Sequence, residues 1–337
     1  MSEPCVIVPN WNGESSLKAC LDSLRAQSLQ AHVIVVDNGS VDGSVALIET
    51  NYPEVELIKL PKNLGFAAGV NTGFQRAIKR DATYVAAFNN DAVADKDWLR
   101  ELVTYLGKYP HAGIAACKLL TADGQALDST GDYYTVWGLP YPRGRGESGI
   151  DAYDDEVDIF AASGGASLYR VSMLQKIGLF DEKFFAYYED VDLSFRAQLA
   201  GWKVSYVPAA RVHHAIGATS SRVRGFTTYQ TLKNLPMLLV KNVPRRYLWR
   251  ISWRYSVAQI FFFGRAVLRG HGWSAIKGKT LCVWLLPRTL RARHRIQKSR
   301  TVSDEYIWGM LVHDLPPNAR ALRRLRAFGW KLRGKRA

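Results

Sequence analysis

The stretch Val33-Ile34-Val35-Val36-Asp37-Asn38-Gly39-Ser40 indicates the fold class, because a short apolar run passes directly into a polar turn. Four consecutive apolar residues predict a strand that is buried on both faces, as in a parallel sheet. Similar runs, each bounded by polar, Gly or Pro residues, recur along the first half of the chain. They cover residues 6–8, 55–60, 84–88 and 113–117.

Helical patterns lie between these apolar runs. Residues 15–27 carry Leu17, Leu21 and Leu24 on one helical face. Further helices are predicted at 44–50, 67–79 and 96–108. This β-α-β-α order predicts an α/β protein with a Rossmann-like, mostly parallel sheet covered by helices on both faces. Ligands of such sheets bind at the carboxyl ends of the strands, so the residues that follow each strand are the site candidates.

Composition excludes several classes of protein. A chain of 337 residues with 47% hydrophobic content suffices for one large domain and a smaller one. The four cysteines are scattered without a C-x-x-C pair, which argues against a disulfide scaffold or a zinc site. The first residues have no basic region, and the first apolar run is too short for a signal-peptide core, so we expect a cytoplasmic location.

Charge is divided unevenly along the chain. Residues 1–220 hold 19 Lys and Arg against 27 Asp and Glu, whereas residues 221–337 hold 26 against 3. An acidic part followed by a strongly basic one indicates a domain joined to a segment that seeks a polyanion. That polyanion is either nucleic acid or an anionic membrane.

The basic part is also aromatic, with Trp, Tyr and Arg interleaved over residues 247–255 and three Phe at 261–263. No uncharged apolar run approaches the ~18 to 20 residues that a spanning helix needs. Aromatics and arginines on helices favour an element in the headgroup region of an anionic leaflet. No nucleic-acid recognition motif accompanies these charges, so we expect a peripheral protein on the inner face of the cell membrane, with no nucleic acid partner.

Two polar turns combine acids with amides. The turn from Asp37 to Ser44 is rich in turn-forming residues and needs no function to explain it. A carboxylate at Asp37 can also accept the imide N–H of a uracil or thymine ring, with Trp11 covering the base. Asn89-Asn90-Asp91 ends another apolar run, where Asp91 either begins a turn or, together with a diphosphate, holds Mg²⁺ or Mn²⁺.

Other candidates have two interpretations each. His213 or His214 is either structural or a further ligand of the metal and diphosphate. Gly65, Gly69 and Gly73 recur every four residues, which indicates close helix-to-sheet packing, although Gly65 at the helix start can also admit a phosphate. The G-x-G-x-x-G motif of dinucleotide-binding proteins is absent.

Three acids lie together in Tyr188-Glu189-Asp190-Val191-Asp192-Leu193, where an amphipathic helix is predicted to begin. On the structural interpretation, Asp190 caps the helix and Asp192 pairs with Arg196 one turn later. On the catalytic interpretation, Asp190 is a general base whose pKa is tuned by neighbouring carboxylates and partial burial.

Taken together, these motifs resemble the family 2 inverting glycosyltransferases with a GT-A fold, in particular the rhamnosyltransferase-like branch. The resemblance covers roughly residues 4–220, with the motifs in the family's order and spacing. The motifs are Val6-Ile7-Val8-Pro9-Asn10-Trp11-Asn12, Asp37-Asn38-Gly39-Ser40, Asn63-Leu64-Gly65-Phe66-Ala67, Asn89-Asn90-Asp91, Ser163-Gly164-Gly165, Tyr188-Glu189-Asp190-Val191-Asp192-Leu193 and His214-Ala215-Ile216-Gly217-Ala218-Thr219.

The resemblance implies a role for each motif. Asp190 is the expected general base, supported by Glu189 and Asp192, and Asp91 with His214 is the expected site of a divalent cation, Mg²⁺ or Mn²⁺. The expected nucleotide-sugar ligands are Pro9, Trp11, Asn12, Asp37, Ser40, Asn63, Gly65, Phe66, Asn89 and Asn90. The expected acceptor ligands are Ser163, Gly164 and Gly165.

Two departures from the family pattern bear on function. Asn89 replaces the first acid of the D-x-D motif, which weakens the case for strict metal dependence. The Q-x-x-R-W motif of processive synthases is absent, which implies one sugar per acceptor. The implied reaction moves one sugar, best matched by L-rhamnose from dTDP-rhamnose, to a lipid-linked or polysaccharide acceptor in bacterial cell-envelope synthesis. The expected lipid-linked acceptor is a polyprenyl-diphosphate-linked saccharide.

Two other functions stay open at this point. A non-catalytic protein that binds nucleotide sugars or nucleic acid requires the acid cluster to be structural. A glycoside hydrolase requires a second carboxylate facing Asp190 across a sugar. The predicted organisation is a GT-A catalytic domain over residues 1–220 and a basic, aromatic, helical membrane-associating segment over 221–337. Within the first, 1–120 is expected to bind the donor and 121–220 the acceptor.

Overall fold

The computed structural model describes residues 3–215, 223–317, 319 and 323, which fall into two compact units. The first unit comprises Met1–Asp132, Pro142–Val223 and Ser299–Val302, and the second comprises Tyr133–Tyr141, Arg224–Lys298 and Ser303–Ala337. The predicted boundary at residue 220, residues 216–219 of the histidine motif and the basic end of the chain from 324 lie outside the described residues. The functional division of the first 220 residues stays a prediction.

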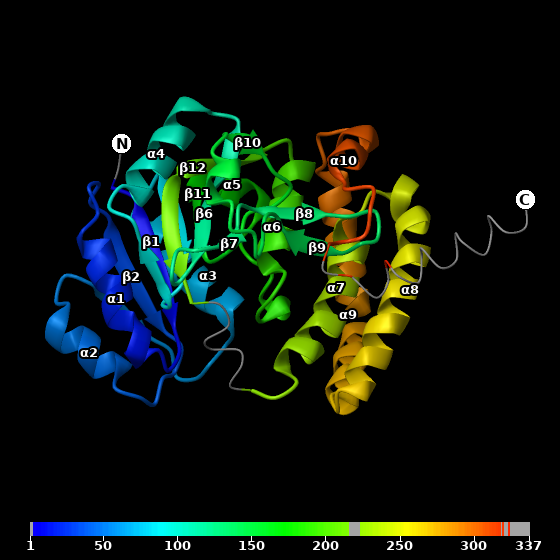
Figure 1. Cartoon of the computed structure of the whole chain (residues 1–337), viewed down its shortest axis with the longest axis horizontal. Coiled ribbons are helices and arrows are strands. Elements are labelled where there is room, and N and C mark those ends of the chain that lie inside the picture. Colours follow the sequence, from blue (N-terminus) through cyan, green and yellow to red (C-terminus); the bar gives the residue numbers. More distant parts are fainter. Residues whose placement is uncertain (1–2, 216–222, 318, 320–322, 324–337) are drawn as a thin grey trace, which may run out of the picture. The chain divides into compact units, whose positions relative to one another are not determined.

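A ten-stranded sheet forms the centre of the first unit, in the order β10-β12-β6-β11-β4-β1-β2-β3, with β5 on β12 and β7 on β6 (Figure 1). Parallel pairs join β1 to β2 and β4, β2 to β3, and β6 to β12. The strands are β1 Cys5–Asn10, β2 His32–Asp37, β3 Glu56–Lys59, β4 Tyr84–Phe88, β5 Ala92–Ala94, β6 Ala112–Thr121, β7 Leu127–Ser129, β10 Val157–Asp158, β11 Ala166–Arg170 and β12 Lys203–His214. A separate pair consists of β8 Asp132–Tyr134 and β9 Pro140–Pro142.

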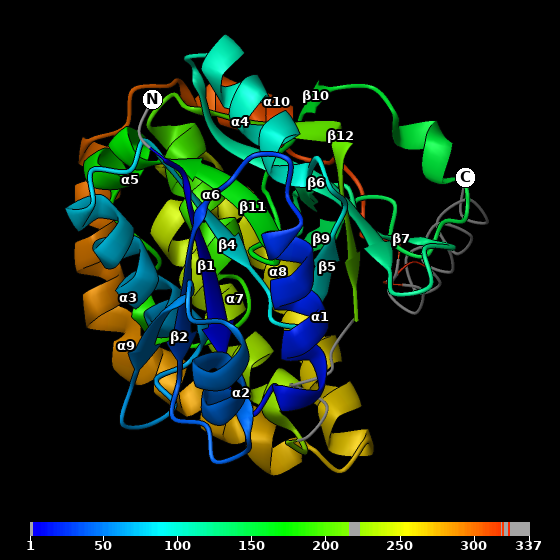
Figure 2. The same ribbon diagram turned by 90° about the vertical axis from the view of Figure 1, so that its left-hand side faces the viewer.

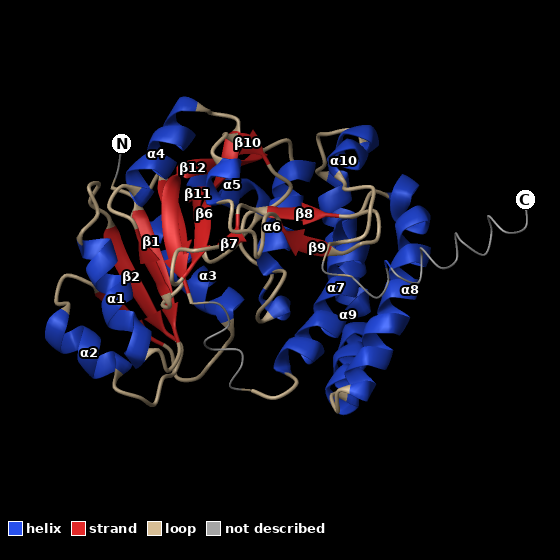
Figure 3. Cartoon of the chain, viewed as in Figure 1, coloured by secondary structure: helices blue, strands red, loops and turns tan. Residues whose placement is uncertain are grey.

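Helices cover both faces of this sheet, as the apolar strands predict (Figures 2 and 3). Along β1, Val6 and Val8 pack with α1, α2 and α4, whereas Cys5 and Ile7 pack with α3 and other helices on the opposite face. This alternation follows from the two-residue period of a strand. The helices are α1 Glu14–Arg25, α2 Ser44–Asn51, α3 Phe66–Lys79, α4 Trp98–Lys108, α5 Val171–Ile177 and α6 Glu189–Leu199, with short 3₁₀ turns at Ile150–Tyr153 and Glu182–Phe184.

The main difference from the predicted elements is strand β11. The Gly- and Ser-rich residues 163–167 predict a turn with a helix directly after it, but Ala166–Arg170 is a strand that runs antiparallel between β4 and β6. The local sequence does not predict this strand, because its residues pair with partners that lie about 50 to 90 positions away along the chain. Helix α5 begins only at Val171.

The second unit contains four helices among its described residues: α7 Phe226–Asn242, α8 Arg245–Leu268, α9 Gly272–Lys298 and α10 Asp304–Met310. Helices α7 and α9 pack closely, since a Cβ added at Gly278 of α9 would lie 2.5 Å from the carbonyl oxygen of Tyr229 on α7. Among the helices described, none combines the length and hydropathy needed to cross a bilayer.

Candidate active site

Asn10 connects three of the predicted motifs at the carboxyl ends of β1 and β2. Its Nδ2 donates to Asp37 Oδ1 at 3.1 Å and to Ser40 Oγ at 3.2 Å, and its Oδ1 accepts from Asn90 Nδ2 at 2.7 Å. Asn10 is 1% exposed. Its motif was recognised but Asn10 itself was not predicted as a site residue. Its role depends on the pairing of β1 with β2 and with β4, which brings residues 27 to 80 positions apart together.

The turn after β2 is stabilised by internal hydrogen bonds, as expected if its polar residues have a structural role. Ser40 N–H donates to Asp37 Oδ2 at 3.0 Å, and Asn12 N–H donates to Ser40 Oγ at 2.8 Å. Each oxygen of Asp37 accepts one hydrogen bond in this way, and a carboxylate has about four acceptor positions. Binding of a base imide N–H at Asp37 therefore remains a prediction, as does a base-covering role for the half-buried Trp11 and for Pro9 beside it.

The loop before α3 is held by amide side chains. Asn63 Oδ1 accepts from Gly65 N–H at 2.8 Å, and Asn38 Nδ2 donates to the Gly65 carbonyl at 3.0 Å. Gly65 has φ +91°, and a Cβ there would lie 2.6 Å from the ring and carbonyl of Phe185. Close packing therefore requires glycine here. At Gly73 the same holds, because a Cβ would lie 2.2 Å from Ile7 of β1.

We expect Gly65→Ala to lower stability by about 1–3 kcal/mol, because a left-handed conformation and a close contact are both disfavoured for alanine. Displacement of the Asn63–Phe66 loop should also weaken nucleotide-sugar binding. Thermal unfolding and donor titration by calorimetry measure the two effects. The matched control is Gly107→Ala in α4, where an added Cβ meets no atom within 4 Å and the change should stabilise by about 0.5–1 kcal/mol. Wild-type behaviour of Gly65→Ala in both measurements would contradict this interpretation.

Gly164 lies between the acid cluster at residues 189–192 and the Asn63–Phe66 loop, which is predicted to bind the donor and is called the donor loop. A Cβ at Gly164 would lie 3.3 Å from the Phe66 ring and 3.4 Å from Asp190 Cβ. Gly164 N–H donates to Asp190 Oδ2 at 2.8 Å, and Val191 N–H donates to Asp190 Oδ1 at 2.8 Å. Next to it, the Gly165 carbonyl accepts from Asn89 N–H at 2.8 Å, while Ser163 Oγ accepts from Gly165 N–H at 3.3 Å. The segment 163–165 thus lies between Asp190 and the Asn89 turn.

The acids of the cluster have different surroundings. The capping role of Asp190 is wrong, because the residue at the helix N-cap is Tyr188 and no side chain caps the helix. The pairing of Asp192 with Arg196 is confirmed at 2.9 Å, with the Asp192 side chain fully buried and Arg196 bonded to the Ile177 and Leu179 carbonyls. Glu189 is buried at the start of α6. Asp192 therefore anchors the helix, and Asp190 is left partly accessible at its first turn.

The backbone that leads into the acid cluster is strained. Phe185, Tyr187 and Tyr188 have φ values of +64°, +71° and +70°. Positive φ is unfavourable for large side chains and is concentrated at functional sites, where surrounding contacts maintain it. Here the Phe185 carbonyl accepts from Ala67 N–H at 3.1 Å, and the Tyr188 carbonyl accepts from Asp192 N–H at 2.9 Å. The strained segment 185–188 is thus hydrogen-bonded to helix α3, which follows the donor loop, and to helix α6.

The predicted metal residues lie side by side. Asp91 Oδ1 is 3.2 Å from His214 Nε2, and Asp128 Oδ2 is 2.8 Å from His214 Nδ1. Asn89 Nδ2 also contacts His214 Nε2 at 3.1 Å. His213 instead lies 3.5 Å from Asp95, because successive side chains of β12 point to opposite faces. Of the two histidines, His214 is the one beside Asp91.

The residues present fit a divalent cation that is shared with a substrate diphosphate. Burial alone would lower the pKa of His214, but its hydrogen bonds to Asp128 and Asp91 raise the pKa to about 9, so a bound cation would replace the proton at His214 Nε2. A carboxylate that orients a histidine through its second nitrogen is typical of metal sites. Within the described part of the chain, no group of three or more His, Cys, Asp or Glu side chains is placed to hold a metal ion. Two protein ligands suit a cation that takes its other ligands from phosphate and water.

Three charged residues of this site were missed from the sequence: Asp128, Asp132 and Arg145. They lie within residues 121–156, whose high content of Gly, Asp, Tyr and Pro predicts a long loop or hairpin beside the site. Only the pairing of this segment with distant strands places them. Arg145 forms a 2.6 Å ion pair with Asp128. Asp132 N–H donates to the Ala161 carbonyl at 2.7 Å, three residues before Gly164. Two aspartates four residues apart in a Gly-containing loop were the available signal.

Asp132 and Asp190 influence one another electrostatically. Desolvation, followed by the charge of Asp190, raises the pKa of Asp132, while Arg145 opposes this effect. Desolvation also raises the pKa of Asp190, against the two backbone N–H groups that donate to it. A raised pKa keeps a carboxylate basic enough to accept a proton near neutral pH.

We expect Asp190→Asn to lower the pKa of Asp132, because the charge of Asp190 is one of the causes that raise it. Asp155→Asn, which alters an exposed aspartate of the same unit, should leave the pKa of Asp132 unchanged. The measurement is a titration of the Asp132 carboxyl carbon by nuclear magnetic resonance. A pKa of Asp132 that stays in place or rises in Asp190→Asn would count against this coupling.

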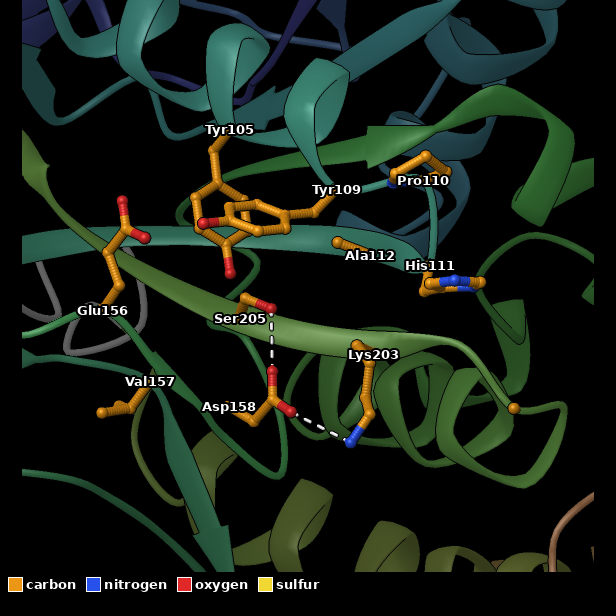
Figure 4. A pocket seen from close by; sticks show the side chains of 11 residues that line it. Tyr105, Tyr109, Pro110, His111, Ala112, Glu156, Val157, Asp158, Lys203 and Ser205 are labelled. Carbon is orange, nitrogen blue, oxygen red and sulfur yellow. Dashed lines mark hydrogen bonds and ion pairs between the residues drawn. The ribbon is translucent and has the colours of Figure 1, made fainter.

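A cavity of about 630 Å³ lies elsewhere in the first unit and is lined by Tyr105, Tyr109, Glu156, Asp158, Lys203 and other residues (Figure 4). It adjoins Ala112 and Lys203, the first residues of the parallel strands β6 and β12. The predicted site residues lie beyond the carboxyl ends of parallel strands. The cavity therefore borders the opposite end of the sheet from the candidate active site.

Comparison with known proteins identifies the fold and family. A family model described as Glycosyl transferase family 2 matches residues 5–178. The chain is 30% identical over 235 residues to the N-acetylglucosaminyl-diphospho-decaprenol L-rhamnosyltransferase of Mycobacterium tuberculosis (strain ATCC 25618 / H37Rv), covering 64% of this chain and 76% of that protein. It is 23% identical over 248 residues to the dTDP-rhamnosyl transferase RfbF of Shigella flexneri, covering 70% and 79%.

A solved structure of GalNAc-T7 with UDP, GalNAc and Mn²⁺ superposes with a TM-score of 0.58 at 16% identity. The match covers 73% of this chain but only 48% of GalNAc-T7, so this chain spans about half of that longer protein. The sheet, its helices and these likenesses define a glycosyltransferase with the GT-A fold, and the C-terminal part is helical, as predicted. The chain belongs to glycosyltransferase family 2 and is rhamnosyltransferase-like.

Proposed function

We propose that this enzyme transfers L-rhamnose from dTDP-rhamnose to a polyprenyl-diphosphate-linked saccharide during synthesis of a bacterial cell-envelope polysaccharide. The observation that carries the proposal is the meeting of Phe66, Gly164 and Asp190, which brings the predicted donor loop beside the predicted base. The names of two relatives support the donor and acceptor: one acts on N-acetylglucosaminyl-diphospho-decaprenol, and the other is a dTDP-rhamnosyl transferase.

The proposed reaction is one in-line displacement that inverts the anomeric carbon. Asp190 accepts the proton of the acceptor hydroxyl as that oxygen bonds to the anomeric carbon, and the nucleoside diphosphate departs from the opposite face. A raised pKa of Asp190 suits this role. The Gly164 and Val191 N–H groups orient both carboxylate oxygens, while the buried Asp192–Arg196 pair fixes α6.

Asp91 and His214 are the proposed ligands of Mg²⁺ or Mn²⁺, with Asp128 holding the His214 ring. A bound divalent cation would neutralise the charge that develops on the departing diphosphate. Asn89 contributes an amide at the position of the first acid of a D-x-D motif, so its Nδ2 contact to His214 is made by a neutral donor instead of a charge. The Mn²⁺ in the GalNAc-T7 structure supports a divalent cation here.

We further propose that one sugar is added per acceptor and that the protein works at the inner face of the cell membrane, where a polyprenyl-linked acceptor is located. The second candidate is a protein that binds nucleotide sugars without catalysis. It requires Asp190 to be structural, and the partial accessibility of Asp190 beside buried, paired Asp192 disfavours it.

A transfer assay tests the proposed donor and acceptor. Purified protein is incubated with Mn²⁺, a short polyprenyl-diphospho-N-acetylglucosamine and, in parallel reactions, dTDP-rhamnose, UDP-N-acetylglucosamine or GDP-mannose. Mass spectrometry of the lipid product should show one added deoxyhexose with dTDP-rhamnose. Product with another donor would overturn the choice of sugar. Donor binding without product from any of the three would favour the non-catalytic candidate.

A further inference from the structure

Helix α8 presents an apolar stripe to solvent along most of its length. Trp249, Trp253, Val257, Ile260 and Val267 recur at spacings of four, four, three and seven residues, which places them on one helical face. Trp249 is 79% exposed and Ile260 is 73% exposed. At about 1.5 Å per residue, the stripe extends over roughly 27 Å.

The opposite face of α8 is already used for packing. Tyr247, Ile251, Tyr255, Ala258 and Ala266 are buried on that face. Ala266 packs with residues of α7 and α9. The exposed residues of the stripe are therefore not part of the core of this unit.

Helix α9 carries a second exposed apolar face. Its large hydrophobic residues that are exposed are Trp273, Ile276, Val283, Trp284, Leu286 and Leu290. Of the 17 exposed large hydrophobic residues among those described, 12 lie on α8 and α9. Single exposed hydrophobics are ordinary on protein surfaces, but gathering of this kind marks an interaction surface.

The charges on these helices decide which partner fits. Residues 245–298 contain 13 Lys and Arg and no Asp or Glu. Several cations lie directly over aromatic rings, such as Arg254 over Trp253 at 5.0 Å and Lys277 over Trp273 at 5.2 Å. A second copy of the same surface would bring only like charge, and the described acids of this unit lie outside it. The basic residues beyond 317 have the wrong sign to cover it as well.

We propose that the exposed faces of α8 and α9 form a membrane-docking surface that lies in the plane of an anionic bilayer. Trp and aliphatic side chains enter the boundary between headgroups and acyl chains, while arginines beside them bind lipid phosphates. Nucleic acid offers the same phosphates but no apolar phase for the exposed Trp, Val and Ile side chains. The inference rests on the proposed membrane location and is independent of the proposed reaction.

Vesicle binding tests the docking surface. The probes are vesicles of 30% phosphatidylglycerol in phosphatidylcholine and vesicles of phosphatidylcholine alone, in a flotation assay without nucleotide. Wild type should bind the anionic vesicles more tightly. The triple variant Trp249→Gln/Trp253→Gln/Ile260→Gln should lose about 100-fold or more in affinity, since each inserted apolar side chain contributes roughly five-fold or more and the three factors multiply. Val41→Gln, which alters a 92% exposed residue of the other unit, should bind as wild type.

A charge variant separates the two contributions. Arg250→Gln/Arg254→Gln/Arg265→Gln should lose about five-fold per arginine on anionic vesicles and much less on phosphatidylcholine. Circular dichroism and thermal unfolding of both variants should match wild type, because none of the replaced apolar or arginine side chains is buried. Donor binding should also be unchanged, so a failed vesicle assay is distinguishable from failure of the proposed reaction.

Four results would overturn the proposal. The first is wild-type affinity of the triple variant for anionic vesicles. The second is equal binding of wild type to both kinds of vesicle. The third is tighter binding of wild type to a 30-base-pair DNA duplex than to anionic vesicles. The fourth is a lipid-free dimer in sedimentation that the triple variant no longer forms, which would assign the surface to a second copy.

Discussion

Asp190→Asn should lower kcat for sugar transfer by about 10³-fold while leaving donor affinity within about three-fold of wild type. The side-chain amide cannot accept the proton of an acceptor hydroxyl. It keeps the size of the carboxylate and one oxygen, so only one of the two hydrogen bonds from Gly164 and Val191 N–H is lost. Loss of one such bond costs about 0.5–1.5 kcal/mol. Steady-state kinetics and donor calorimetry on the same preparation measure the two effects.

Asp192→Asn provides the structural contrast, because it differs from Asp190→Asn only by two positions on α6. It removes one partner of the buried pair with Arg196, which should destabilise the fold by about 3–5 kcal/mol and lower Tm clearly. Asp190→Asn, which loses only one hydrogen bond, should lower Tm by no more than a few degrees, about 2–4 °C per kcal/mol lost. Turnover near the wild-type rate in Asp190→Asn would remove this residue from the mechanism. A large fall in its Tm would make its role structural.

Asp91→Asn should lower transfer by about 10²–10³-fold and abolish most of the response to Mn²⁺. Asp91 is the only carboxylate of the Asn89-Asn90-Asp91 turn, and its Oδ1 lies 3.2 Å from His214 Nε2. Without that charge, a cation would be held by His214 and the substrate diphosphate alone. The measurement is the rate of transfer as a function of Mn²⁺ concentration, with donor binding followed separately.

Asp95→Asn is the matched control for Asp91→Asn, because both aspartates contact a histidine of β12. Asp95 lies 3.5 Å from His213, whose side chain points away from Asp91 and His214. Its replacement should leave transfer within about three-fold and preserve the Mn²⁺ response. If Asp95→Asn and Asp91→Asn reduced transfer equally, the assignment of Asp91 and His214 as the metal pair would be wrong.

The parts of the fold predicted from sequence are those specified by local pattern. Strands β1, β2 and β4 and helices α1 and α3 lie where apolar runs and helical periodicity indicate, within a few residues. Such elements carry their signal in consecutive residues. Strand β11 was not predicted, because it depends on partners in β4 and β6 that are distant in sequence.

The same distinction between local pattern and distant contacts applies to the residues of the candidate site. Asp91, Asp190 and His214 belong to motifs that a single chain displays, and the structure places Asp91 beside His214. Asp128 and Asp132 have no such motif. They reach the site only because β7, residues 127–129, pairs with β6 and Asp132 pairs with Ala161, an arrangement that involves tertiary contacts rather than local propensity.

The sequence alone also does not predict the directions of the two adjacent histidines or the different burial of the two aspartates. His213 and His214 are adjacent, and only their strand assignment separates their directions. The acid cluster held one structural and one partly accessible aspartate, and burial distinguishes Asp192 from Asp190. The chemical interpretation of Asp190 therefore gains support from the role that Asp192 already fills.

The anomeric configuration of the product tests the central claim most directly, because one base and one displacement can only invert that carbon. The glycolipid formed by wild type from a donor of known configuration is isolated before any second reaction, and the one-bond carbon–hydrogen coupling at its new anomeric centre is measured by nuclear magnetic resonance. We predict the configuration opposite to that of the donor. Retention of the donor configuration would contradict a single displacement with Asp190 as the base.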